Sequence, residues 1–165
     1  MIVETNREDY VALCLGRAPR RFHNADTPIA PVEVLEMLAG VAAQVWETFS
    51  PASWLIVEAD QVVGLCSVTR PPTGGVIDIG YGVAPSRRNA GVAGRAIGDI
   101  AAWAKASPAV SAITADTSPD NIASQRVLQR NGFVAVGERI DEEDGPVICW
   151  RLVTASTAPM PLRVP

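Results

Sequence analysis

The residues best suited to bind a ligand form the run Arg87-Arg88-Asn89-Ala90-Gly91-Val92-Ala93-Gly94, between an expected strand and an expected helix. A helix start has unpaired backbone N–H groups and the positive end of the helix dipole, so it attracts anions. Glycine has no Cβ, so a diphosphate can approach the main chain closely. The run therefore predicts a diphosphate loop, although its glycines alone are equally consistent with close packing on a sheet. It is neither a Walker loop nor a GxGxxG fingerprint.

The elements that must position this loop follow from hydrophobic periodicity. We expect helices over 7–17, 31–49, 89–106 and 119–131, and strands over 54–58, 62–68, 76–84, 110–115, 133–140 and 147–153. This order predicts an α+β fold with a mixed, mostly antiparallel sheet of about six to seven strands and about four helices, and a parallel crossover in the middle of the sheet. We expect a single domain over 1–153 and a flexible, Pro-containing tail over 154–165.

Composition excludes several functional classes. The chain has 165 residues, a net charge of -4 and no long Lys/Arg block, so we expect no nucleic-acid partner. Cys14, Cys66 and Cys149 form no CxxC pair and His23 is the only histidine, so we expect neither a metal nor a disulfide framework. The N-terminus lacks the apolar region of a signal peptide, and no apolar run approaches about 18 residues, which favours a cytoplasmic protein without a membrane partner.

Two motifs carry a resemblance to a known family. Arg88-x-x-Gly91-x-Ala93 matches the [QR]-x-x-G-x-[GA] motif of GNAT acetyltransferases. The stretches Asp78–Arg88 and Ser118–Phe133 resemble the branch that includes ribosomal-protein N-terminal acetyltransferases, which writes the second stretch as PDN-x-x-S-x-x-VL-x-x-x-GF. The resemblance covers about Trp54 to Val153, and the N-terminal third of the chain is generic.

The resemblance implies the GNAT fold and acetyl-CoA as co-substrate. It implies that the backbone of Tyr81, Gly82 and Val83 pairs with the pantetheine arm, and that the diphosphate lies on the run Arg87–Gly94. Asn121 corresponds to an asparagine near the arm, although Asn is also common at a helix start. One departure is that Gly94 and Arg95 stand where the branch commonly has Thr-Glu, which removes an acidic residue from the loop.

Ser124 is the candidate donor to the cofactor sulfur. Many GNAT proteins have a tyrosine at the position of Leu128, where it protonates the departing thiolate, and that tyrosine is missing here. Ser124 and Leu128 are four residues apart and share a helix face, so Ser124 is the best remaining donor. Its hydroxyl could instead bond to a helix carbonyl. A thiol has a pKa of roughly 8.5, so the thiolate can leave with only a hydrogen bond.

The candidate general bases are strand carboxylates. Asp116 lies near the place where some relatives carry a glutamate base, and Asp78 fits the glutamate of the branch pattern E-I-G-Y. Either could deprotonate the amine through water, and each is at least equally consistent with a solvated strand residue. Glu58 and His23 are weaker candidates, beside a hairpin turn and in a loop.

The sequence supports one reading over two alternatives. The first is an N-acetyltransferase in which a primary amine, on a protein N-terminus or a small molecule, attacks acetyl-CoA directly. The second is a catalytically weak acyl-CoA-binding sensor or regulatory module, which the missing tyrosine favours. The third is a structural domain, which requires both motifs to be coincidental. The acceptor is open, and so is the choice between monomer and homodimer.

Overall fold

A computed structural model of the chain describes residues 1–155, so all but the start of the expected tail lies outside the described residues. The helices are α1 (Arg7–Cys14), α2 (Val32–Val45), α3 (Val92–Ala106) and α4 (Ile122–Arg130), with a 3-10 turn over Pro85–Arg87. The strands are β1 (Ile2–Glu4), β2 (His23–Asn24), β3 (Ser53–Glu58), β4 (Gln61–Val68), β5 (Val76–Val83), β6 (Ala112–Thr117), β7 (Val134–Asp141) and β8 (Gly145–Val153).

The strands form one mixed sheet in the order β1-β3-β4-β5-β6-β8-β7, with β2 beside β4. Most neighbours are antiparallel, but β5 and β6 are parallel and α3 connects them, which confirms the predicted α+β fold and its central crossover. Within the described residues 1–155, the sheet has eight strands rather than six or seven. The additional ones, β1 and β2, contain only three and two residues, too few to show an alternating pattern.

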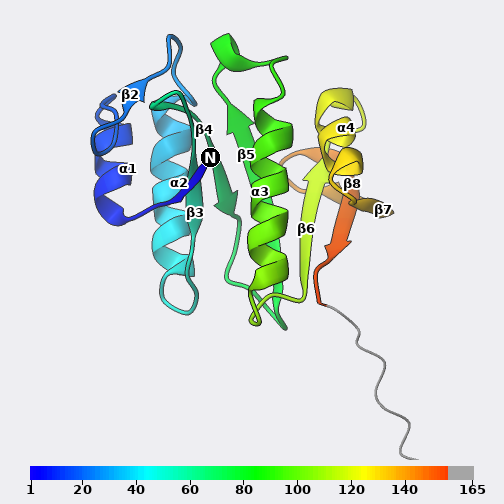
Figure 1. Cartoon of the computed structure of the whole chain (residues 1–165). Coiled ribbons are helices and arrows are strands. Elements are labelled where there is room, and N and C mark those ends of the chain that lie inside the picture. Colours follow the sequence, from blue (N-terminus) through cyan, green and yellow to red (C-terminus); the bar gives the residue numbers. More distant parts are fainter. Residues whose placement is uncertain (156–165) are drawn as a thin grey trace, which may run out of the picture.

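Helices cover the two faces of the sheet in pairs. Ser53 and Trp54 are consecutive on β3, so their side chains point to opposite faces. The Ser53 hydroxyl lies 2.7 Å from the Tyr10 hydroxyl of α1, whereas the Trp54 ring packs edge-on against Trp103 of α3 at 5.1 Å. One face therefore carries α1 and α2, and the other carries α3 and α4. Figure 1 shows α1 and α2 beside β3 and β4, with α3 and α4 farther along the sheet.

The α1/α2 face is open beyond β4. Ser53, Ser67 and Gly80 lie opposite one another across β3, β4 and β5, so they belong to this face. Ser53 and Ser67 are buried, but Gly80 is exposed, and so are Gly82 on β5 and Asp116 on β6. This uncovered part of the sheet, from β5 to β7, is called the open face below.

Local sequence explains where the helices begin. Asn6 and Asp9 form a capping box at the start of α1, each side chain accepting a hydrogen bond from the other residue's backbone N–H at 2.9 Å. Helix α3 starts at Val92 rather than at the expected residue 89, because Gly91 precedes it with a left-handed φ of 75°. Within residues 1–155, no helix is long and apolar enough to cross a membrane.

Candidate active site

The parallel strands β5 and β6 separate in the middle of the sheet. Their pairing runs from Val76 opposite Ala112 to Ile79 opposite Ala115. Beyond that point β5 continues to Val83 paired only with β4, and β6 continues to Thr117 paired only with β8. The gap between Gly80–Val83 and Asp116–Thr117 is called the wedge. Backbone groups that face it lack a strand partner, so an extended ligand can pair with them.

The loop that the sequence predicts to bind a diphosphate comes shortly after the C-terminal end of β5. Asn89 and Gly91 both have positive φ, at 61° and 75°, and they turn the chain from the 3-10 segment into α3. Asn89, Ala90 and Gly91 are exposed, whereas Val92 is buried against the sheet. The N-terminus of α3 therefore opens toward solvent at the end of the wedge strand, and its free N–H groups make it a suitable place for an anion.

The arginines near the loop are held in place by the sheet. Arg87 donates to the Gln61 side chain, and the Arg88 Nε donates to the Val83 carbonyl at 3.3 Å. Arg95 pairs with Glu58 at 2.7 Å, and its guanidinium covers Gly91 so closely that a Cβ there would lie 2.8 Å from Nη1. Arg95, the departure from the branch pattern, thus lies over the loop as one half of an ion pair with Glu58. The weak base candidate Glu58 is occupied by this ion pair.

The structure brings Ser124 of α4 and Tyr81 of β5 together. The Tyr81 hydroxyl lies 2.6 Å from the Ser124 Oγ, across the mouth of the wedge on the α3/α4 face. Asn121 caps α4, because its side chain accepts a hydrogen bond from the Ser124 backbone N–H at 3.1 Å. Leu128 is fully buried and fills the site where many relatives carry tyrosine. The contact of Tyr81 with Ser124 joins residues 43 apart in sequence, and no sequence pattern indicated it.

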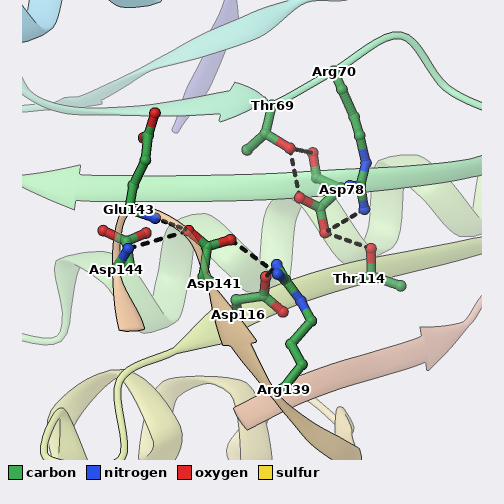
Figure 2. Close-up of polar contacts among 9 residues, drawn as sticks. All are labelled: Thr69, Arg70, Asp78, Thr114, Asp116, Arg139, Asp141, Glu143 and Asp144. Atoms are coloured by element: carbon green, nitrogen blue, oxygen red, sulfur yellow. Dashed lines mark hydrogen bonds and ion pairs between the residues drawn. The ribbon is translucent and has the colours of Figure 1, made fainter. Parts of the chain in front are cut away.

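Asp78 lies on the open face, on β5 two residues before the wedge. Figure 2 shows it between Thr69 and Thr114. It accepts hydrogen bonds from the hydroxyls of Thr69, which follows β4, and of Thr114 on β6, the latter at 2.6 Å. Arg70 is 3.8 Å away and largely exposed. The Asp78 carboxylate is therefore held by two neutral hydroxyls and only loosely by a cation.

Asp116 lies at the wedge on β6 and is held differently (Figure 2). Arg139 of β7 pairs with Asp116 and also with Asp141, the latter at 2.9 Å. The two carboxylates raise the pKa of Arg139 above its ordinary value. The backbone N–H groups of Glu143 and Asp144, together with Arg139, lower the pKa of Asp141. Asp78 and Asp116 thus share a face but belong to separate networks.

Sequence reasoning did not find Thr69, Thr114 or Arg139. Thr69 follows β4, Thr114 is on β6 beside Asp78, and Arg139 reaches Asp116 from β7, across β8, so only the strand order and register could have placed them there. His23, the distant base candidate, is exposed on β2, where its strand pairs with Gln61–Val62. Among residues 1–155, no group of three or more His, Cys, Asp or Glu side chains is arranged to hold a metal ion.

A cavity of about 730 Å³ lies beside the diphosphate loop on the α1/α2 side. Apolar side chains from α1, α2 and β4 form much of its wall, and Pro85 and Arg88 connect it to the loop. The segment 24–32 closes it, and Thr27 in that segment bonds to the Ser86 hydroxyl at 2.9 Å. A ligand in this cavity would therefore lie next to whatever the diphosphate loop binds.

Comparison with known proteins agrees with this geometry. A family model described as an acetyltransferase (GNAT) domain matches residues 2–134. An uncharacterized N-acetyltransferase of Bacillus subtilis, YjdG, is 35% identical over 85 residues, which is 50% of this chain and 51% of that protein. The matched segment thus spans about half of that curated relative.

Solved structures of the same fold cover nearly the whole chain. RimL, a ribosomal L7/L12 α-N-protein acetyltransferase in complex with coenzyme A, has a TM-score of 0.70 at 17% identity, covering 92% of each chain. The ribosomal-protein-S5-alanine acetyltransferase of Vibrio fischeri has 0.68 at 16%, covering 93% of this chain and 92% of its own. The aminoglycoside acetyltransferase AAC(6')-Ib with ribostamycin and coenzyme A has 0.67 at 16%, with the same coverages.

Proposed function

Because the chain belongs to the GNAT acetyltransferase domain family, we propose that it transfers an acetyl group from acetyl-CoA to a primary amine by direct attack. The observation that carries this proposal is the continuity of the wedge with the diphosphate loop. A single stretch, from Gly80 to Gly94, offers an unpaired strand edge and then a helix N-terminus. The cofactor presents matching groups in the same order: an extended pantetheine arm, which can pair with a strand edge, and then a diphosphate, which a helix N-terminus can bind.

In this proposal the cofactor binds along that stretch. The diphosphate lies on the loop Arg87–Gly94, and the pantetheine arm pairs with the backbone of Tyr81, Gly82 and Val83. Asn121 and Ser124, at the start of α4, lie beside the arm at the opposite side of the wedge. Ser124 donates a hydrogen bond to the sulfur as the thiolate leaves. Holding the thioester and the amine together provides most of the rate.

The acceptor amine reaches the thioester from the open face, where Asp78 and Asp116 lie. We propose Asp78 as the better general base, acting directly or through water, because its partners are neutral hydroxyls. Asp116 is instead engaged in an ion pair by the guanidinium of Arg139. The cavity beside the loop would hold the body of the acceptor. Structural neighbours act on a ribosomal protein N-terminus and on an aminoglycoside, so both acceptor classes stay open.

The second candidate is an acyl-CoA-binding sensor with little catalytic activity. The burial of Leu128 at the tyrosine position favours it, as does the ion pair that occupies Asp116. Release of CoA in the presence of a panel of amines distinguishes the two, because a sensor binds acetyl-CoA without consuming it. A cytoplasmic location and the absence of metal and nucleic-acid partners stay predictions from sequence.

The test is calorimetric titration of the protein with acetyl-CoA, using Gly91→Asp and Gly91→Asn as a matched pair. Both residues tolerate a left-handed φ better than other side chains do, and they differ by one charge. The Arg95 side chain, the nearest group, is flexible enough to move aside. Asp places a carboxylate where the diphosphate binds, so we expect at least tenfold weaker binding than for Asn.

Three outcomes of the titration are informative. Saturable binding that Asp weakens and Asn largely keeps supports the loop as the cofactor site and justifies the amine screen. Equal affinities of the two variants for acetyl-CoA would show that the diphosphate does not bind at this loop. If the folded wild-type protein binds neither acetyl-CoA nor longer acyl-CoA, the proposal fails.

A further inference from the structure

The hydrogen bond between Tyr81 and Ser124 is the only contact across the wedge that joins two hydroxyls in the described part of the chain. Tyr81 lies on the stretch of β5 that has no partner on the β6 side. Its side chain points to the α3/α4 face, because Tyr81 is opposite Cys66, which in turn is opposite Trp54. Ser124 lies in the first turn of α4. In the proposed complex, the pair therefore lies beside the sulfur at the end of the pantetheine arm.

The direction of this hydrogen bond follows from the acidity of its two hydroxyls. The Tyr81 and Ser124 hydroxyl oxygens lie 2.6 Å apart, where either could donate, and the Ser124 carbonyl is a much longer second acceptor for Tyr81 at 3.4 Å. A phenol is a stronger acid than an alcohol, and hence the better donor. We therefore take Tyr81 as the donor at the short contact and Ser124 as its acceptor, which leaves the Ser124 proton free to point elsewhere. Burial raises the pKa of Tyr81, so the phenol stays protonated over the working pH range.

We propose that Tyr81 is a positioning residue that aims the Ser124 hydroxyl proton at the cofactor sulfur. This rests on the proposed acetyl transfer. The amine nitrogen bonds to the carbonyl carbon, the C–S bond breaks, and its electron pair stays on sulfur. The Ser124 O–H then donates a hydrogen bond to the thiolate, which later takes a proton from water, while the amine proton leaves through a base or water. Hydrogen bonds in a chain strengthen one another, so Tyr81 makes Ser124 a better donor.

The phenol that is missing from α4 is replaced in this arrangement by the phenol of Tyr81 on β5. The α4 tyrosine that many relatives use is Leu128 here, and its fully buried side chain leaves no hydroxyl on that turn. The phenol instead comes from β5 and reaches the sulfur site only through Ser124. Tyr81 therefore has a polar role, although its sequence context indicated only core packing and backbone pairing.

The experiment titrates the thiol of bound CoA in the wild-type protein, following the ultraviolet absorbance of the thiolate. A donor aimed at sulfur favours the charged form, so the bound thiol should have a pKa about one unit below its free value of roughly 8.5. Tyr81→Phe and Ser124→Ala should each remove most of that shift. The double variant should look like Ser124→Ala alone, because Tyr81 acts only through Ser124.

Tyr10→Phe is the matched control. Tyr10 is also buried and bonds to a serine hydroxyl, that of Ser53 at 2.7 Å, but it lies on the opposite face of the sheet. It removes the same kind of hydrogen bond, and hence a similar amount of stability, without approaching the wedge. We expect the thiol of CoA bound to Tyr10→Phe to titrate as in the wild type.

The outcomes separate this inference from the proposed function. If CoA binds and Tyr81→Phe leaves the thiol pKa unchanged, the inference is wrong while the cofactor site stands. Tighter CoA binding by Tyr81→Phe with no pKa change would mean that the pair is a latch over an empty wedge, which also overturns it. An equal Tyr81→Phe effect in the Ser124→Ala background would show that Tyr81 does not act through Ser124. If the wild type does not bind CoA, both proposals fall.

Discussion

The two faces of the β5–β6 junction differ in their functional groups and in how far apart those groups lie in the sequence. On the α3/α4 face, the junction leads into the loop Arg87–Gly94, whose residues are consecutive, and carries one pair of neutral hydroxyls, those of Tyr81 and Ser124. On the open face it consists of carboxylates, each engaged by partners from other strands. A binding surface made of one short segment depends mainly on local conformation, whereas a set of bases depends on long-range pairing. We therefore expect substitutions of the open-face carboxylates to act on turnover and substitutions in the loop Arg87–Gly94 to act on cofactor binding, whereas substitutions of Tyr81 and Ser124 act on the departing thiolate.

The largest expected effect on the open face is that of Asp78→Asn. Removing a general base typically costs a factor of about 10² to 10⁴ in rate, and we expect about 10² here, with the KM for acetyl-CoA within about twofold. Steady-state kinetics with an active amine would measure it. Asp116→Asn is the matched control and should lose less than about tenfold, because Arg139 already engages that carboxylate. The reverse order would assign the base to Asp116.

The next effect concerns Leu128→Tyr, which restores the residue of many relatives. Leu128 has no exposed surface, so a larger side chain must displace its neighbours. We expect unfolding in urea to show a loss of about 1–3 kcal/mol, with no gain in turnover. Leu128→Met, which nearly conserves volume, should cost less than about 1.5 kcal/mol. A stable and faster Leu128→Tyr variant would contradict the role given to Ser124.

A smaller effect is expected for Arg139→Gln. This change frees the Asp116 carboxylate from its ion pair, so that carboxylate becomes available to an incoming amine. We expect a rise of a few-fold in turnover for Asp78→Asn combined with Arg139→Gln, relative to Asp78→Asn alone, which is less than one kcal/mol of barrier. No change in that pair of rates would place Asp116 out of reach of the amine.

The smallest effect is the pH dependence of the β7–β8 turn. Hydrogen bonds from Glu143 and Asp144 lower the pKa of Asp141 in the folded state, so its contribution is present above the unfolded pKa, near 4. That contribution is lost as the pH falls through the folded pKa. Asp141→Asn should therefore be slightly less stable than the wild type at pH 7, and the two should converge near pH 2. Urea unfolding at both pH values measures this, and a gap that widens in acid would contradict it.

Sequence predicted the fold more completely than the site. The long periodic segments were found, and the two short strands were missed because β1 and β2 carry too few residues to alternate. The second helix ends at Val45, four residues before the expected Phe49, since apolar spacing continues into the turn that follows. The loop Arg87–Gly94 could be proposed as a diphosphate site from sequence because its residues are consecutive and need no tertiary contact to be recognised, and its role stays a prediction.

The carboxylates of the open face could be predicted only as candidate bases. Asp78 and Asp116 were chosen for their strands, but their partners Thr114 and Arg139 are 36 and 23 residues away. Their placement depends on which strand lies beside which, and on the register, and neither follows from local pattern. The same holds for Tyr81, whose hydroxyl partner comes from the helix after the next strand.

The separation of β5 from β6 also makes part of the sheet depend on its ligand. Amide groups between Gly80 and Val83 that face the wedge have no strand to protect them, so they should exchange with solvent by small local openings rather than by global unfolding. A ligand that pairs with them acts as a temporary strand and closes the sheet. Hydrogen exchange at this stretch therefore reports occupancy site by site, and protection there should rise with cofactor concentration. We therefore expect the local stability of the sheet at Gly80–Val83 to depend on how much cofactor is bound.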